Sequence, residues 1–230
     1  MLNANHLSKR YSTPAGDLTV LRDVTLSLNA GESASVMGPS GSGKSTLLYI
    51  LGGLEPPSSG AVQLDGVDPY TLAPNALAAF RNRGVGFVLQ DHCLLPQCTV
   101  LENVLVPTLV GEADADAPNR AKALVELVGL GERLHHRPAE LSGGEKQRAA
   151  IARALVRQPR LILCDEPTGN LDAETAATVA DLLISLHARL QAIMVVVTHN
   201  EALGSRFARR WTMNRGVLTT SQSTTASETR

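Results

Sequence analysis

The feature that most constrains this chain is the segment Gly-Pro-Ser-Gly-Ser-Gly-Lys-Ser at residues 38–45. In it, Gly38 and Gly43 are separated by four residues and followed by Lys-Ser. A strand-like apolar run at 34–37 precedes the segment, and a helix-like run starts at Lys44 and stops at Gly52 and Gly53. The glycines let backbone N–H groups and a helix N-terminus face an anion without a side chain in the way. The segment therefore predicts a strand, a phosphate-binding loop and a helix, in that order.

The side chains at the end of this loop suit a nucleoside triphosphate. Lys44 supplies a point charge to the β- and γ-phosphates, and the hydroxyl of Ser45 suits Mg²⁺, a hard cation that prefers oxygen ligands. A serine here is also compatible with a simple helix N-cap. The residues of the loop that we expect to contact nucleotide are Gly38, Pro39, Ser40, Gly41, Ser42, Gly43, Lys44, Ser45 and Thr46.

A second carboxylate-bearing segment follows an apolar run at 161–164. Asp165 and Glu166 stand where that strand would end, which is the edge at which α/β sheets place ligands. Asp165 suits the metal shell, and Glu166 is positioned to orient and deprotonate the water that attacks the γ-phosphate. Two solvated acids capping a loop are the alternative, but a phosphate loop in the same chain favours the catalytic interpretation.

Strand-like and helix-like runs alternate along the chain, which predicts an α/β fold. We expect a β-rich N-terminal part, parallel strands in the core, and an inserted α-helical subdomain at about 91–158. The expected strands are at 18–28, 34–37, 61–64, 84–89, 161–164 and 193–197, and the expected helices at 44–51, 119–128 and 175–190. We assign residues 1–218 to one nucleotide-binding domain and 219–230 to a disordered polar tail.

Composition narrows the possible partners. With 43% hydrophobic residues in 230, the chain can bury a substantial core, and a net charge of −1 supplies no cationic field for nucleic acid. Neither a secretory signal nor an apolar stretch of about 20 residues is present, so we expect a cytoplasmic protein without direct membrane insertion. Three cysteines without metal-ligand spacing are expected to be reduced thiols.

The segment Leu-Ser-Gly-Gly-Glu at 141–145, followed by Lys-Gln-Arg and an Ala-rich run, resembles the signature segment of ABC ATPases. Ser142 and Glu145 also stand in the register of a capping box ahead of a helix expected to run through Leu155, and both interpretations can hold together. The resemblance implies a P-loop NTPase of the ABC type that works as a pair of copies. In such a pair, Ser142, Gly143 and Gly144 of one copy would close over the γ-phosphate held by the other.

Four further positions match the family pattern in order. The resemblance implies that Tyr11 stacks on adenine, that Gln90 senses Mg²⁺, that Asp172 lies in the loop crossing the dimer interface, and that His199 contacts the γ-phosphate. Taken alone, such a tyrosine more often packs, such a glutamine is usually solvated, and a single histidine usually has no catalytic role. The implied catalytic residues are Lys44, Glu166 and His199, and the implied metal ligands are Ser45, Gln90 and Asp165.

Several longer strings, among them DEPTGNLD and HHRPAELSGGEKQRAAIARALV, are most similar to the ATPases of lipoprotein-releasing systems, the LolD family. The resemblance implies an ATPase on the cytoplasmic face of the inner membrane. It would bind two integral membrane subunits similar to LolC and LolE and move outer-membrane-directed lipoproteins to a periplasmic carrier. ATPases of macrolide or peptide exporters and of the cell-division complex carry similar strings and remain alternatives. The apolar segment 92–104, including Leu95 and Val100, is a candidate groove for a membrane subunit, with ordinary packing as the alternative.

Overall fold

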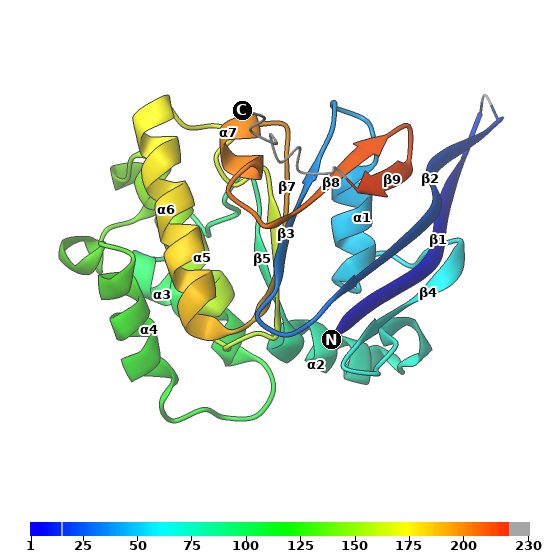
Figure 1. Cartoon of the computed structure of the whole chain (residues 1–230). Coiled ribbons are helices and arrows are strands. Elements are labelled where there is room, and N and C mark those ends of the chain that lie inside the picture. The colour runs from blue at the N-terminus through cyan, green and yellow to red at the C-terminus, as the bar shows by residue number, and fades with distance from the viewer. Residues whose placement is uncertain (15, 221–230) are drawn as a thin grey trace, which may run out of the picture.

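The computed structural model describes residues 1–14 and 16–220 and contains two sheets and a set of helices (Figure 1). The antiparallel three-stranded sheet has the order β2-β1-β4, and the six-stranded sheet has the order β5-β6-β7-β3-β8-β9, in which only β9 is antiparallel to its neighbour. The strands are β1 Leu2–Thr13, β2 Gly16–Leu28, β3 Ser33–Met37, β4 Ser59–Leu64, β5 Val85–Val88, β6 Leu161–Asp165, β7 Ile193–Thr198, β8 Arg209–Asn214 and β9 Val217–Thr220.

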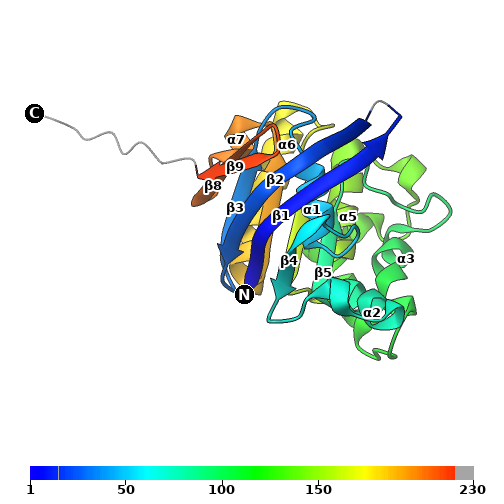
Figure 2. The same ribbon diagram turned by 90° about the vertical axis from the view of Figure 1, so that its right-hand side faces the viewer.

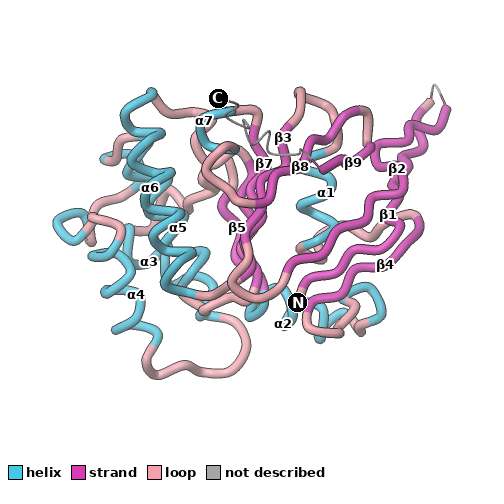
Figure 3. The backbone as a smooth tube through the Cα atoms, viewed as in Figure 1, coloured by secondary structure: helices cyan, strands magenta, loops and turns pink. Residues whose placement is uncertain are grey.

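The helices divide the molecule into layers (Figures 1 and 3). They are α1 Lys44–Leu51, α2 Pro74–Gly84, α3 Val100–Leu105, α4 Ala117–Leu127, α5 Gly143–Leu155, α6 Ala173–Leu190 and α7 Glu201–Gly204. Short 3₁₀ turns occupy Pro69–Thr71, Val106–Leu109, Gly131–Arg133 and Pro138–Glu140. Helix α1 lies between the two sheets, and α3 to α6 gather on the other side of the six-stranded sheet, while Figure 2 shows the three-stranded sheet from its own side.

The central strands β6 and β7 explain why both faces of the larger sheet are covered. Successive side chains of a strand point to opposite faces. Leu161 and Leu163 pack with α1 and the smaller sheet, whereas Ile162 and Cys164 pack with the helices of the other layer. Each strand is therefore apolar up to its last residue, which is the pattern of a parallel sheet buried on both sides.

Fold class and most elements agree with the prediction from sequence. The chain is α/β with a β-rich N-terminal part, and the described residues between β5 and β6 form helices and turns without a strand. All three cysteines are free. Among residues 1–14 and 16–220, no helix has the length and apolar character needed to cross a membrane.

Several expectations differ from the structure. Strand β1, helices α2, α3 and α7 and the β8–β9 hairpin were not expected, and the strand expected at 84–89 is confined to Val85–Val88 because Gly84 ends α2. The expected boundary at residue 219 is wrong by two residues, because Thr219 and Thr220 pair with Thr212 and Trp211 in β9. The rest of the expected tail, 221–230, lies outside the described residues.

Candidate functional site

The phosphate loop connects the C-terminal end of β3 to the first turn of α1, as the sequence predicts. Gly43 is the N-cap of α1 and has a φ of 105°, a left-handed conformation that residues with a side chain rarely adopt. A Cβ at Gly43 would also lie 2.8 Å from the carbonyl oxygen of Val20. Glycine is thus required here both by the backbone angle and by the neighbouring strand, and the first N–H groups of α1 remain open to an anion.

Two polar side chains of the loop are buried. The Lys44 ammonium group donates to the carbonyl oxygens of Gly38 (2.8 Å) and Pro39 (3.1 Å), and it lies 3.9 Å from a carboxylate oxygen of Glu166. The Ser42 hydroxyl is buried and has no hydrogen-bond partner among residues 1–14 and 16–220. Since a buried polar atom without a partner is destabilising, this hydroxyl indicates a position for a ligand oxygen. The loop therefore fits a phosphate group.

The predicted metal pair is assembled in the structure. The Ser45 hydroxyl donates to Asp165 at the end of β6 over 3.0 Å, although the two residues are 120 positions apart. Asp165 is 8% exposed, and burial raises the pKa of its carboxyl, with the hydrogen bond from Ser45 opposing that shift. A hydroxyl and a carboxylate are the oxygen donors that Mg²⁺ prefers, so the pair fits this cation.

Glu166 and His199 form a direct pair beside the phosphate loop. One carboxylate oxygen of Glu166 lies 2.8 Å from the Nδ1 atom of His199, while the other accepts from the Thr198 hydroxyl (2.9 Å) and the His199 backbone N–H (3.2 Å). Glu166 has a φ of 44°, and its own N–H donates to the carbonyl oxygen of Val197. This strained backbone turns the side chain toward β7 and Lys44, away from the course of its own strand.

A cleft of about 320 Å³ borders the phosphate loop on the side of the smaller sheet. Its lining residues are Leu18, Val20, Gly41, Gly43, Lys44, Ser45 and Thr46. Tyr11 is paired across the hairpin with Leu18, and its hydroxyl donates to Glu55 over 2.7 Å. Burial and then the bond to Glu55 raise the pKa of Tyr11, and a hydrogen bond with Thr46 acts in the opposite sense. Tyr11 thus contacts two residues that line this cleft, Leu18 and Thr46, and its stacking on adenine stays a prediction.

Two predicted site residues have other contacts in the structure. The amide of Gln90 donates to the side-chain oxygen of Asn170 (3.1 Å), so its hydrogen-bond partner is in the loop before α6 and not in the Ser45–Asp165 pair. Asp172 caps the N-terminus of α6 by accepting from the N–H groups of Glu174 and Thr175. The role of Gln90 as a metal ligand therefore stays a prediction.

The signature segment lies at the start of α5. Ser142 and Glu145 form the predicted capping box. The Ser142 hydroxyl accepts from the Glu145 backbone N–H over 3.2 Å, and the Glu145 carboxylate accepts from the Ser142 backbone N–H over 2.8 Å. A Cβ at Gly144 would lie 2.3 Å from the Thr175 side chain, so the close contact between α5 and α6 requires glycine. Within residues 1–14 and 16–220, no hydrogen bond or ion pair joins Ser142 or Gly143 to the phosphate loop.

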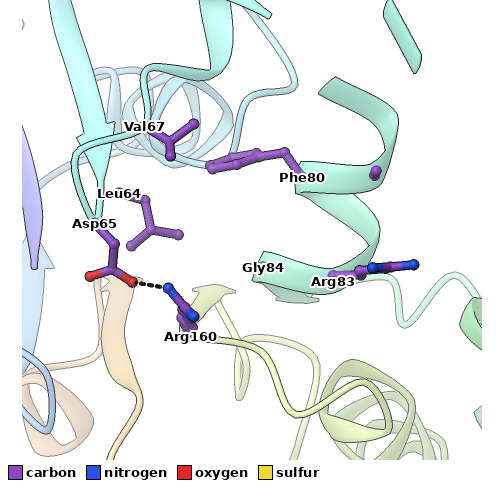
Figure 4. A pocket seen from close by; sticks show the side chains of 8 residues that line it. Leu64, Asp65, Val67, Phe80, Arg83, Gly84 and Arg160 are labelled. Atoms are coloured by element: carbon purple, nitrogen blue, oxygen red, sulfur yellow. Dashed lines mark hydrogen bonds and ion pairs between the residues drawn. The ribbon is translucent and has the colours of Figure 1, made fainter. Parts of the chain in front are cut away.

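Two clefts away from the phosphate loop contain none of the predicted site residues. One, of about 360 Å³, lies where β5 and β6 begin, at the edge of the sheet opposite the phosphate site, and Arg160 donates to Asp65 across it over 2.7 Å (Figure 4). The other, of about 470 Å³, borders α2, a helix with no buried residue; its apolar lining residues are Leu54, Ala78, Ala79, Phe87 and Val110.

The segment 92–104 contributes less to the surface than the sequence suggests. Val100 and Val104 are 1% and 0% exposed and belong to the core formed with α4 and α5. Val100 therefore does not line a surface groove, and ordinary packing, the alternative considered from sequence, describes it. Leu95 is 38% exposed.

Some residues that complete these contacts were not predicted. Lys9, Glu55, Asn170 and Thr198 were given no role from the sequence, and each reaches the site through the tertiary fold. Two of them had a local signal: Asn170 lies in the string DEPTGNLD, and Thr198 directly precedes His199 at the end of a buried strand.

The chain belongs to the ABC transporter family, whose model matches residues 21–169. It is 50% identical over 219 residues to the lipoprotein-releasing system ATP-binding protein LolD 1 of Rhodopirellula baltica, covering 95% of this chain and 96% of that protein. It is 48% identical to the corresponding LolD protein of Pseudomonas fluorescens, with the same shares covered. The predicted family is thus confirmed.

Solved structures support the same conclusion for the fold. The dimeric structure of MJ0796, a bacterial ABC transporter cassette, is 36% identical with a TM-score of 0.85, covering 94% of this chain and 95% of that one. The post-hydrolysis dimer of MJ0796 bound to ADP and Pi is 34% identical with a TM-score of 0.86, covering 97% and 100%. The predictions of an ABC-type fold and of an ATP-binding ATPase coupled to transport are confirmed.

Proposed function

We propose that this chain is the ATP-hydrolysing subunit of a lipoprotein-releasing ABC transporter. The observation that carries the proposal is its identity of 43–50% to LolD proteins of several bacteria along nearly the whole of both chains. Exporter and cell-division ATPases share some of its strings, but no feature of the structure favours them.

In this proposal the reaction centre is the edge of the sheet where β3, β6 and β7 end. Lys44 and the open N–H groups of α1 bind the β- and γ-phosphates, and the Ser42 hydroxyl takes one phosphate oxygen as its missing partner. Glu166 accepts a proton from the attacking water, and His199 holds that carboxylate and contacts the γ-phosphate. Tyr11 stacks on adenine at the other end of the cleft.

Ser45 and Asp165 would hold Mg²⁺ through their hydroxyl and carboxylate oxygens. When bound, the ion would neutralise charge on the phosphates. The protein contributes the two oxygen donors in a fixed geometry, and burial of Asp165 keeps competing solvent away. Gln90 would need to leave Asn170 to reach the same ion.

The functional unit in this proposal is a pair of copies with ATP between them. Support comes from the separation of two anion-binding helix ends in one chain, α1 and α5, and from the dimeric state of the related MJ0796 cassette. Ser142, Gly143 and Gly144 of one copy would meet the γ-phosphate bound by the other. Asp172, which caps the neighbouring helix, would lie in the same interface.

Two integral membrane subunits of the LolC and LolE kind would complete the transporter and hold this chain at the cytoplasmic face of the inner membrane. The cleft beside α2 is the best candidate for their cytoplasmic segments. It exposes Leu54 and Val110 at 48% and 61%, and the helix that borders it buries no side chain of its own.

Reconstitution tests the proposal. The chain is co-purified with its membrane subunits in proteoliposomes that carry an acylated lipoprotein, and soluble acceptor is added with ATP. We expect ATP-dependent transfer of the lipoprotein to the soluble fraction, and none with the Glu166→Gln variant. ATP hydrolysis that instead drives export of a drug or peptide, or that activates a cell-wall hydrolase, would contradict lipoprotein release while leaving the ATPase assignment intact.

A further inference from the structure

Lys9 is a buried cation next to the tyrosine assigned to adenine. It lies on β1 two residues before Tyr11, on the same face of the strand, and is 9% exposed. Its ammonium group lies 2.9 Å from Glu55, donates to the carbonyl oxygen of Pro56 over 2.7 Å, and stands 5.0 Å from the centre of the Tyr11 ring. Lysine is rarely buried unless its charge is matched, so the surroundings hold this group in place.

Glu55 joins this lysine to the tyrosine. One of its carboxylate oxygens pairs with Lys9, and the other accepts from the Tyr11 hydroxyl over 2.7 Å. Burial alone would raise the pKa of Glu55, but the hydrogen bonds from Lys9 and Tyr11 outweigh it and lower the pKa, so the carboxylate is ionised at neutral pH. The aromatic ring is therefore held at its hydroxyl end and against one of its faces.

The same group is tied to the helix that carries the phosphate loop. The Tyr70 hydroxyl oxygen lies 2.5 Å from the backbone carbonyl oxygens of both Glu55 and Ile50 in α1, so its single hydrogen is shared between these two acceptors. The position of the ring is thus linked through Glu55 to α1, at whose N-terminus Lys44 and Ser45 lie. The fold sets the spacing between an aromatic face and the phosphate loop before any nucleotide binds.

We propose that Lys9 and Glu55 are positioning residues for the purine base, acting through Tyr11. Lys9 covers one face of the ring and leaves the other for adenine, and Glu55 fixes the ring's tilt through the hydroxyl. A ring that is already fixed loses less conformational freedom when the base stacks on it, which strengthens binding without new contacts to the nucleotide. This inference rests on the proposed ATP site with Tyr11 as its adenine platform.

The inference predicts an effect confined to the base. Inorganic tripolyphosphate offers the phosphate chain of ATP without a base, so its binding should not depend on the orientation of Tyr11. General damage to the fold near α1 would weaken both ligands together. The ratio of the two dissociation constants therefore separates positioning of the base from a merely structural role.

The test measures dissociation constants of ATP and tripolyphosphate for the purified full-length chain by calorimetry, with thermal melting of each variant. Lys9→Met should weaken ATP binding about three- to tenfold, with tripolyphosphate unchanged. Lys9→Arg should recover most of the loss, since a guanidinium can also lie over a ring. Tyr11→Ala should weaken ATP binding about tenfold or more. Arg160→Met, which removes a cation from the Asp65 pair, is the matched control and should change neither constant.

Two further variants keep the test independent of folding. Tyr11→Phe keeps the ring but releases it from Glu55, and the double variant Lys9→Met with Glu55→Gln removes both charges so that neither is left unpaired. Each should weaken ATP binding about twofold or more with tripolyphosphate unchanged. If Tyr11→Ala does not affect ATP, the proposed adenine site is wrong. If Tyr11→Ala is the only variant that weakens ATP binding, or if Lys9→Met weakens the binding of ATP and tripolyphosphate equally, the positioning role is overturned and the ATP site stands.

Discussion

The phosphate site and the signature segment are built in opposite ways. At the phosphate site the polar groups are buried and connected across three strand ends: Lys44 and Asp165 are 7% and 8% exposed, and Glu166 is fixed by Thr198 and His199. At the signature segment, Ser142 and Gly143 are exposed, and the capping box satisfies the start of α5 from within five residues. One region is organised by the tertiary fold, and the other by local sequence.

This difference bears on how a pair of copies would share the reaction. The phosphate site holds its acids and lysine in place before nucleotide binds, so we expect a single chain to bind ATP there. The signature segment needs no partner for its own stability and can present its exposed helix end to a second copy. A substitution in the first region should therefore affect the chemistry directly, whereas one in the second should affect association.

The strongest expected contrast comes from Glu166→Gln. Removing the base should reduce turnover about 10³-fold, because general base catalysis typically contributes factors of 10²–10⁴. ATP binding should persist, so an ATP-bound dimer should accumulate in size-exclusion chromatography. Glu126→Gln, at an exposed position of α4, is the control and should leave turnover unchanged. Undiminished hydrolysis by Glu166→Gln would refute the assignment of the base.

Ser142→Arg tests the signature segment. The larger cationic side chain would occupy the space for the partner's γ-phosphate, so turnover should fall about 10²-fold, the order of effect seen when a donor to a reacting oxyanion is lost. Binding of ATP to the monomer should be retained. Dissociation constants and sedimentation velocity measure the two effects separately, with Ser185→Arg on the exposed face of α6 as control. A Ser142→Arg protein that still dimerises with ATP would refute the shared site.

Sequence reasoning succeeded where a local pattern and a motif coincide. The strand, loop and helix around Gly43 and Lys44 follow from glycine spacing and apolar runs, and the capping box follows from Ser142 and Glu145 alone. Helix α2 was not predicted from the sequence because it has no buried residue and hence no apolar stripe. In β8, Trp211 and Met213 do alternate with polar residues, but the run is short, and two of the four residues of its partner strand β9 are threonine.

Contacts between distant segments account for what the sequence could not predict at the site. The motifs placed Glu166 and His199 near the same phosphate, but their pairing depends on the left-handed backbone of Glu166. Lys9 and Glu55 carry no motif, and they meet only because β1 pairs with β4 and lies over α1. A sequence motif predicts the side chains that contact a ligand, whereas the side chains that position those residues can be identified only from the fold.

Asp165→Asn tests whether the phosphate site sacrifices stability for its function. Burial raises the pKa of Asp165, which means that the ionised form is less favourable in the folded than in the unfolded chain. At pH values above the folded-state pKa, the charge on Asp165 therefore lowers the free energy of unfolding. As the pH falls through the folded-state pKa toward about 4, the ordinary pKa of aspartate, the carboxyl becomes protonated and this destabilisation disappears. For the nucleotide-free protein at pH 7, the variant should melt about 2–4 °C higher, corresponding to about 1 kcal/mol.

The same measurement repeated at lower pH provides the control for Asp165→Asn. The difference in melting temperature between variant and wild type should shrink between neutral pH and about pH 4, because both side chains are then uncharged. A variant that melts at or below the wild-type temperature at pH 7 would show that the buried charge is compensated in the free protein, and the contrast between the two regions would lose its energetic basis.

The loss of a helix cap should have an effect of similar size, and it distinguishes the two roles of Ser142. Ser142→Ala should reduce stability by about 1 kcal/mol, the usual cost of removing an N-cap hydroxyl. Thr99→Ala removes the equivalent hydroxyl from the capping box of α3, where Thr99 and Glu102 bond reciprocally, and should cost about the same. Only Ser142→Ala should also weaken ATP-dependent dimerisation at a temperature where both variants are folded. Equal dimerisation by the two would mean that the hydroxyl of Ser142 serves the helix alone, and that the backbone of Gly143 and Gly144 is what a partner's phosphate meets.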